Sequence, residues 1–122
     1  MKIKGEIVEK IEILNGDEVA CIIDVNTKDW GQINKVTNFI ENPLYLGEYN
    51  TKDKFMSFIE TRVVDKRRQN RVALYPEWAK TTLDEVYYSN GFSLDDYLWV
   101  KFYPRDKYKK FKDVNPIMSK NM

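Results

Sequence analysis

The feature that most constrains this fold is an Asn-Gly dipeptide set between two runs of alternating apolar residues. Odd-numbered positions from 3 to 13 are mostly apolar, and the alternation resumes at positions 19, 21 and 23. Alternation with a period of two places apolar side chains on one face of a strand. Asn-Gly readily adopts the positive φ values of a tight hairpin turn. We therefore predict that residues 2–14 pair antiparallel with residues 18–25 around Asn15-Gly16.

A two-stranded ribbon alone is marginally stable, so this hairpin is expected to join a larger sheet. Residues 97–103 have the aromatic and β-branched content of a strand that ends at Pro104, and we expect this strand to be the partner. Trp99, on that strand, is expected in the core. Residues 44–46 could add a further short strand, and residues 26–34 are typical of a loop.

Helical patterns occupy the middle of the chain. A stripe at Phe55, Ile59 and Val63 predicts a helix over residues 52–64. A second helix is expected over 65–75, limited by Pro76, and a third from 81 or 82 to 88, stopped by Asn90-Gly91. The fold class is therefore predicted to be α+β, an N-terminal hairpin joined to a small mixed or antiparallel sheet with two to three short helices. We expect one domain over 1–114 and a flexible tail over 115–122.

Composition excludes several function classes. The 122 residues contain no His and a lone Cys21, which removes Ser-His-Asp triads, His-containing zinc sites and a disulfide framework. Cys21 itself is expected to be a small buried hydrophobe. The net charge of the chain is +1, whereas a typical nucleic-acid-binding domain is strongly positive. No signal peptide or membrane span is apparent, so we expect a cytoplasmic protein that needs no cofactor.

Two charged clusters are candidate sites. Asp95 and Asp96, with Asp84 and Glu85, could bind a hard cation or act in acid/base chemistry. Their positions at predicted helix starts and turns favour helix capping or ion pairing instead. Asp96 is expected to pair with Arg62 or Arg68 through a bidentate bond.

The densest basic run is Lys66 to Arg71, in which Arg side chains fit phosphate and Gln or Asn could reach base edges. A solvated helix face is the simpler interpretation. Arginine beside an accessible Trp is also typical of protein interfaces. We predict that Arg67, Arg71 and Trp78 form the partner-binding surface. The Lys-rich segment 105–112, with two aromatic residues, could add a second contact.

Two spaced motifs suggest a family. The first is Arg62-Val63, four residues, Arg68, one residue and Asn70. The second is Ser93-Leu94-x-Asp96-x-x-Trp99-Val100-Lys101, followed by Asp113-Val114-Asn115. In this order they resemble the small region upstream of the kinase-like domain in HipA-like proteins of low-GC bacteria and mobile elements. The resemblance covers residues 55–115, and it implies that Arg62, Arg68, Asn70, Ser93, Asp96 and Trp99 are mainly structural.

The resemblance implies no kinase activity, because the chain has no glycine-rich phosphate loop, catalytic-loop Asp with a downstream Asn, or Asp-Phe-Gly motif. We expect a non-enzymatic, regulatory protein-binding module, encoded by a mobile element or prophage, whose partner is a kinase-like protein. One alternative is a phage-type inhibitor of a CRISPR-like host defence nuclease complex. Another is a nucleic-acid-binding domain that uses residues 67–71.

Overall fold

The predicted hairpin forms the centre of a sheet. The computed structural model describes residues 1–25, 33–38, 51–63 and 74–121, with the backbone alone for 33–38 and 51–53. Within it, β3 (Lys10–Asn15) pairs antiparallel with β4 (Glu18–Val25). Asn15 pairs with Glu18, so the turn residues are Gly16 and Asp17, and Gly16 has a φ of 62°. The predicted strand pairing is confirmed for residues 10–25, but the turn lies one residue later than the predicted Asn15-Gly16, because Asn15 is still paired in β3.

The first half of the predicted strand 2–14 is wrong. Residues Lys2–Ile3 (β1) and Glu6–Ile7 (β2) form a separate small hairpin. Its turn uses Lys4 at φ 54° and Gly5 at φ 75°. The apolar pattern conceals this break because Ile7 keeps the expected parity although it is 53% exposed. Tyr87 holds the hairpin to a helix by donating to a Glu6 carboxylate oxygen at 2.7 Å.

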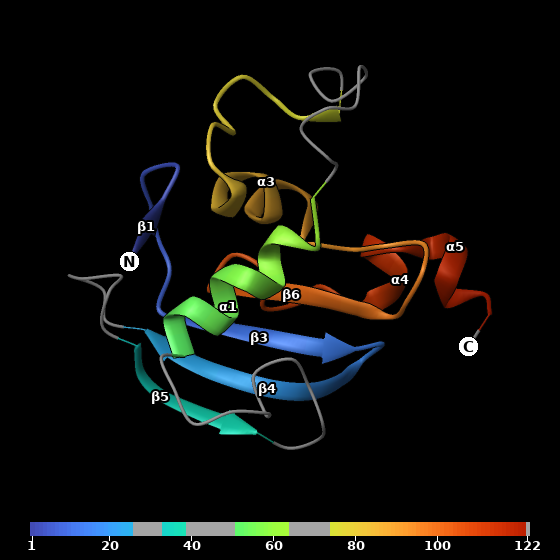
Figure 1. The fold of residues 1–122 in the computed structure, drawn as a ribbon. Helices are drawn as coiled ribbons and strands as arrows, with labels where there is room; N and C mark the ends of the chain where they lie inside the picture. Colours follow the sequence, from blue (N-terminus) through green and yellow to red (C-terminus); the bar gives the residue numbers. More distant parts are fainter. Residues whose placement is uncertain (26–32, 39–50, 64–73, 122) are drawn as a thin grey trace.

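The sheet has four antiparallel strands in the order β5-β4-β3-β6 (Figure 1). The last strand in the chain, β6 (Leu98–Tyr103), pairs with β3, which confirms the predicted partner of the hairpin. The edge strand β5 (Ile33–Asn38) begins inside the segment predicted as a loop, so that boundary is wrong by two residues. The possible strand at 44–46 lies outside the described residues.

Two longer helices lie on one face of the sheet, α1 (Thr51–Glu60) and α3 (Thr82–Ser89) (Figure 1). The first ends four residues before its predicted end and continues as a turn. The second begins at a capping box in which Thr81 and Asp84 bond each other's backbone amides. The predicted helix 65–75 falls almost entirely on residues 64–73, outside the described part of the chain.

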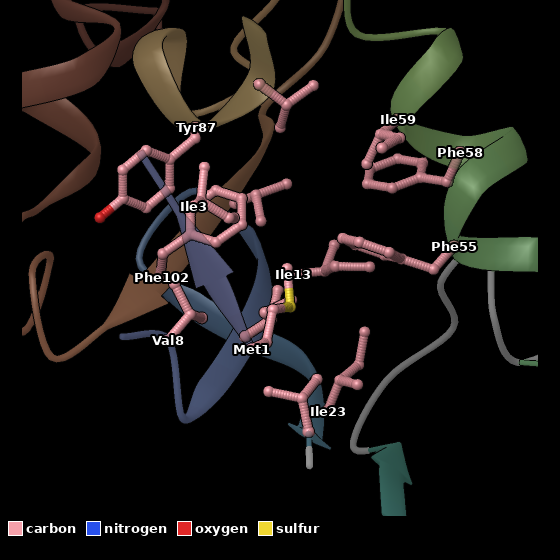
Figure 2. Close-up of a cluster of buried hydrophobic side chains, with 14 of the residues drawn as sticks. Met1, Ile3, Val8, Ile13, Ile23, Phe55, Phe58, Ile59, Tyr87 and Phe102 are labelled. Atoms are coloured by element: carbon pink, nitrogen blue, oxygen red, sulfur yellow. The ribbon is translucent and has the colours of Figure 1, made fainter. Parts of the chain in front are cut away.

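The main core lies between these helices, the β1–β2 hairpin and the sheet. Figure 2 shows Phe55 of α1 directed toward Ile13 of β3, and Ile59 of the same helix belongs to the same buried cluster. Burial of these large apolar side chains supplies the main driving force for folding. Other buried members, from the strands, the link between β2 and β3, and α3, are Ile3, Val8, Ile11, Cys21, Ile23, Val25, Val86, Tyr87, Val100 and Phe102.

A second, smaller core lies on the opposite face of the sheet, where α4 (Phe111–Val114) and α5 (Pro116–Ser119) pack. It contains Leu14, Trp99 and Phe111, with Trp99 fully buried as predicted. A bulge in the β3–β4 pairing between Ile13 and Leu14 reverses the side-chain parity. Val19 consequently packs on this core and not on the face of Cys21, contrary to the sequence pattern.

The predicted flexible tail contains α5. Asn115 caps this helix by accepting from the Met118 amide, and Asn115 is only 1% exposed. Met118 packs on the second core. This segment therefore has defined local structure up to residue 121. The mobility expected for residues 115–122 stays a prediction. None of the helices in the described ranges is long and apolar enough to span a bilayer.

Candidate binding site

Arg62, just after α1, joins three segments of the chain. Its two terminal guanidinium nitrogens bond the two Asp96 carboxylate oxygens, each at 2.7 Å. It also donates to the carbonyl oxygens of Gly91 at 2.8 Å and Leu98 at 2.9 Å. A bidentate bond fixes both position and orientation. The structure thus contains the predicted pairing of Arg62 with Asp96, and the pair links α1 to the turn before β6.

The Asp96 carboxylate is held in its charged form. Burial acts to raise its pKa, but hydrogen bonds from Arg62 and from the Leu98 amide outweigh that effect. The pKa of Asp96 therefore lies below its usual range. The Asp96 carboxylate therefore stays ionised at neutral pH and keeps its ion pair with Arg62.

Asn90 completes the outer edge of β6. This residue ends α3 in the left-handed conformation, at φ 60°. Its carbonyl oxygen accepts from the Val100 amide, and its side-chain amide donates to the Val100 carbonyl, both at 2.8 Å. These bonds satisfy strand groups that would otherwise present an open edge. The sequence indicated only that Asn90 would stop a helix.

Asp106 is the centre of a second polar network. Its fully buried side chain accepts from Asn90 at 2.7 Å and from the Phe102 amide at 3.0 Å. Arg105 bonds both carboxylate oxygens, and the Lys109 ammonium lies 3.1 Å from one of them. Burial raises the pKa of Asp106. The hydrogen bonds from Arg105 and the Phe102 amide, with the charges of Arg105 and Lys109, lower it by more, so the net pKa is below the usual range.

An open cleft of about 890 Å³ lies beside these two networks. Arg62, Asn90 and Lys109 contribute to its lining, so part of the wall is fixed by the bonds described above. Several apolar side chains line the rest. They are Val63, Leu74, Tyr75, Tyr88, Phe92, Leu94 and Val114.

Four of these apolar side chains are strongly exposed. Leu94 is 57% exposed, Tyr88 53%, Leu74 43% and Phe92 39%. Single exposed apolar residues are common on protein surfaces, but a group around one concavity is typical of an interaction site. Two exposed carboxylates, from Asp95 and Asp113, also line the cleft.

The cleft unites residues from both family-like motifs. Arg62 and Val63 belong to the first motif; Ser93 and Leu94 belong to the second; Asp113 and Val114 come from its downstream end. A direct bond also connects the second motif to its downstream end, because Asn115 donates to the Ser93 carbonyl at 2.8 Å. Residues as far apart as 62 and 114 therefore meet at one surface.

Trp78, predicted as a binding residue, is half-buried. Its ring packs on the main core and lies edge-on to Tyr87 and Tyr88. The Lys4 ammonium lies 4.7 Å from the ring centre. Trp78 is not among the described residues that line the cleft, but its ring contacts Tyr88, which does line it and also contacts Tyr75 on the cleft wall. Its role in partner binding stays a prediction.

The other predicted binding and motif residues, Arg67, Arg68, Asn70 and Arg71, lie outside the described residues. Their proposed roles also stay predictions. The described residues on either side of that segment, Val63 and Leu74, both line the cleft.

Two of the four acidic residues that could have formed a cation site, Asp84 and Asp96, have structural partners instead. Asp84 accepts from the Thr81 amide in the capping box, and Asp96 pairs with Arg62, as the capping interpretation predicted. Among the described residues, no three Asp, Glu or Cys side chains are grouped closely enough to hold a metal ion. Cys21 is fully buried, and burial raises the pKa of its thiol to about 11.

Sequence reasoning missed the exposed apolar wall of the cleft. Tyr88 belongs to α3, whereas Phe92 and Leu94 lie in the segment between α3 and β6. Neither the helical pattern nor the turn residues indicate that these three side chains form one group. Comparisons with protein families, characterised proteins and solved structures found no match to this chain.

Proposed function

We propose that this chain is a non-enzymatic protein-binding module and that the cleft binds an apolar segment of a partner protein. The observation that carries the proposal is the convergence of both motifs on this cleft, where Leu94 and Tyr88 expose more than half of their surface. Burying such side chains against a partner releases about 25 cal/mol for each Å² of apolar surface.

The rigidity of the cleft favours binding further. Arg62 makes four hydrogen bonds that fix the end of α1 to the turn carrying Leu94, and Asn115 fixes the same turn through Ser93. A preformed site loses little conformational entropy when the partner binds. The aromatic ring of Tyr88 supplies a large contact area with few rotatable bonds.

The ionisable groups of the cleft are better suited to structure than to catalysis. Arg62 and Lys109 both lie in ion pairs, with Asp96 and Asp106. In each pair the pKa of the carboxylate is below its usual value, whereas a general base works best with a pKa near neutrality. The sequence also contains no His to act near pH 7.

The resemblance to the HipA-like accessory region favours a kinase-like protein as the partner. The module would then be a free-standing relative of that region, carried by a mobile element, as its Lys-rich and Asn-rich composition suggests. A phage-type inhibitor of a host defence nuclease would use the same kind of surface. The two functions differ in the partner, so the partner must be identified biochemically.

Affinity purification with matched variants tests this proposal. Leu94→Asp places a charge in the cleft, whereas Ile117→Asp places one on α5 at a residue with similar exposure, 62% against 57%. Neither change should alter the melting temperature by more than a few degrees, because exposed substitutions usually cost within about 0.5 kcal/mol. Wild-type and variant proteins are expressed as baits in the native host, and captured proteins are quantified by mass spectrometry.

We expect one protein to be captured equally by wild type and Ile117→Asp, but at least about tenfold less by Leu94→Asp, as for an interface hot spot. If the captured protein is kinase-like, the result supports the HipA-like role. If it is a subunit of a nuclease, the result supports the inhibitor role. Equal capture of every protein by all three baits would contradict binding through the cleft.

A further inference from the structure

The segment after β6 carries three lysines that form no ion pair with another described residue. Arg105 and Lys109 are paired with Asp106. Lys107, Lys110 and Lys112 are exposed, and none of the ion pairs among the described residues includes them. We call these three lysines, together with Tyr108, the lysine-tyrosine patch. A polyanion would gain charge-assisted contacts there.

Tyr108 is 85% exposed, more than any other large hydrophobic side chain that the structure describes. Phe111, three residues later, is 1% exposed and fills the second core. The Lys107 ammonium is the nearest described cation to the Tyr108 ring, at 5.4 Å from its centre. With 85% of its surface exposed, the Tyr108 ring is accessible to stacking by another planar group.

The patch is held on a rigid base. The Asp106 and Lys107 amides donate to the Phe102 and Pro104 carbonyls at 2.8 and 3.2 Å, and the Lys109 amide donates to the Asp106 carbonyl at 3.0 Å. The buried Asp106 side chain ties this turn to β6 and α3. Binding at the patch therefore needs little ordering of the backbone.

Two carboxylates lie near the patch but point into the protein's own backbone. Asp17 accepts from the Phe111 amide at 2.8 Å, and Asp113 accepts from the Lys110 amide at 2.9 Å. Both partly offset the positive charge of the lysines. We therefore expect a ligand that combines negative charge with stacking, because charge alone would bind weakly here.

We infer that the lysine-tyrosine patch binds single-stranded nucleic acid, with the three lysines on phosphates and Tyr108 stacked on an unpaired base. Single strands fit this surface because their bases are free to stack on an exposed aromatic ring, whereas a duplex offers the patch only phosphates. The lysines carry no base-reading geometry, so binding should be independent of sequence. This activity is separate from the cleft and does not depend on the proposed partner.

Fluorescence anisotropy with a labelled oligo-dT of about twelve nucleotides tests the inference, since that length covers a typical single-strand site. Each phosphate neutralised on a single strand contributes about 0.7 to the slope of log affinity against log salt. Three lysines should give a slope of about −2, so affinity should fall roughly 20-fold between about 50 and 200 mM salt. A duplex of the same length should bind more weakly than the oligo-dT.

Two sets of variants separate stacking from charge. Tyr108→Ala should weaken oligo-dT binding at least about fivefold without changing the salt slope, whereas Tyr108→Phe should keep wild-type affinity. Neutralising Lys107, Lys110 and Lys112 to Gln should remove most of the salt slope. The matched control neutralises Lys2, Lys4 and Lys80, which are also exposed, and should keep the slope.

Three results would overturn the inference. The first is an equal loss of salt slope in the two triple-lysine variants. The second is wild-type affinity for oligo-dT in Tyr108→Ala. The third is binding to phosphatidylserine vesicles without binding to oligo-dT. The last result would make the patch a membrane-surface contact. Leu94→Asp should bind oligo-dT normally, so a failure of the cleft proposal would leave this result unchanged.

Discussion

Asn90 and Asp106 finish the edge of the sheet with side chains where another strand would otherwise pair. Together they bond the amide and carbonyl of Val100 and the amide of Phe102. Neither residue belongs to a recognisable motif, because the bonding depends on the left-handed turn after α3 and on the turn after β6. Their roles could not be predicted from sequence. The spaced motifs did predict an arginine partner for Asp96, but they left Arg62 and Arg68 as alternatives.

Replacing Asp106 with Asn should destabilise the fold by about 3 kcal/mol, because removing one partner of a buried ion pair leaves its cations and amides poorly satisfied. The melting temperature should fall by on the order of 10 °C. Thermal unfolding followed by circular dichroism measures this change. Unchanged stability would mean that water can hydrate the Arg105 and Lys109 side chains when the Asp106 carboxylate is absent.

The contribution of Asp106 should also depend on pH. Its folded-state pKa lies below its usual value, so its stabilising effect is fully present above the unfolded pKa of about 4 and is lost as pH falls through the folded value. The difference in unfolding free energy between wild type and Asp106→Asn should be constant near neutrality and shrink in acid. Urea titrations across this range provide the measurement, and a difference that grew in acid would contradict the assignment.

Trp99→Ala should cost on the order of 3 to 5 kcal/mol, as expected for a fully buried aromatic side chain. The indole is 0% exposed, and its N–H donates to the Gly16 carbonyl. The loss should appear as lower stability in urea unfolding. A variant of normal stability that had only lost its partner would assign Trp99 to binding and not to the core.

At the scale of elements, local turn chemistry predicted the centre of the fold but not its N-terminus. Asn15-Gly16 predicted β3 and β4, and the aromatic run predicted β6. The β1–β2 hairpin was missed because Lys4, a residue with no preference for positive φ, begins its turn. Val19 was misplaced because the bulge after Ile13 shifts the strand parity.

Gly16→Val tests the central turn. Gly16 has a φ of 62°, a region that a β-branched residue adopts with strain, and we expect a loss of roughly 2 kcal/mol. Differential scanning calorimetry should therefore show a lower melting temperature. An unchanged melting temperature would show that this turn does not depend on the left-handed conformation.

At the scale of the whole molecule, the cleft is a product of tertiary structure. Its lining comes from five separated stretches, after α1, before α3, at the end of α3, before β6 and around α4. The spaced motifs predicted that Asp96 would pair with Arg62 or Arg68, and the structure shows the pair with Arg62. The motifs could not predict which apolar residues stay exposed, because exposure at Leu94 or Tyr88 depends on packing between distant segments.

The central claim is that the apolar wall of the cleft contacts a partner protein directly. Site-specific photo-crosslinking tests this most directly, with a photoreactive phenylalanine at Leu94 in one variant and at the similarly exposed Ile117 in the other. After irradiation in the native host, we predict a defined crosslinked protein species for position 94 and none for position 117. The same crosslinked species from position 117 alone would contradict the account and place the partner on α5.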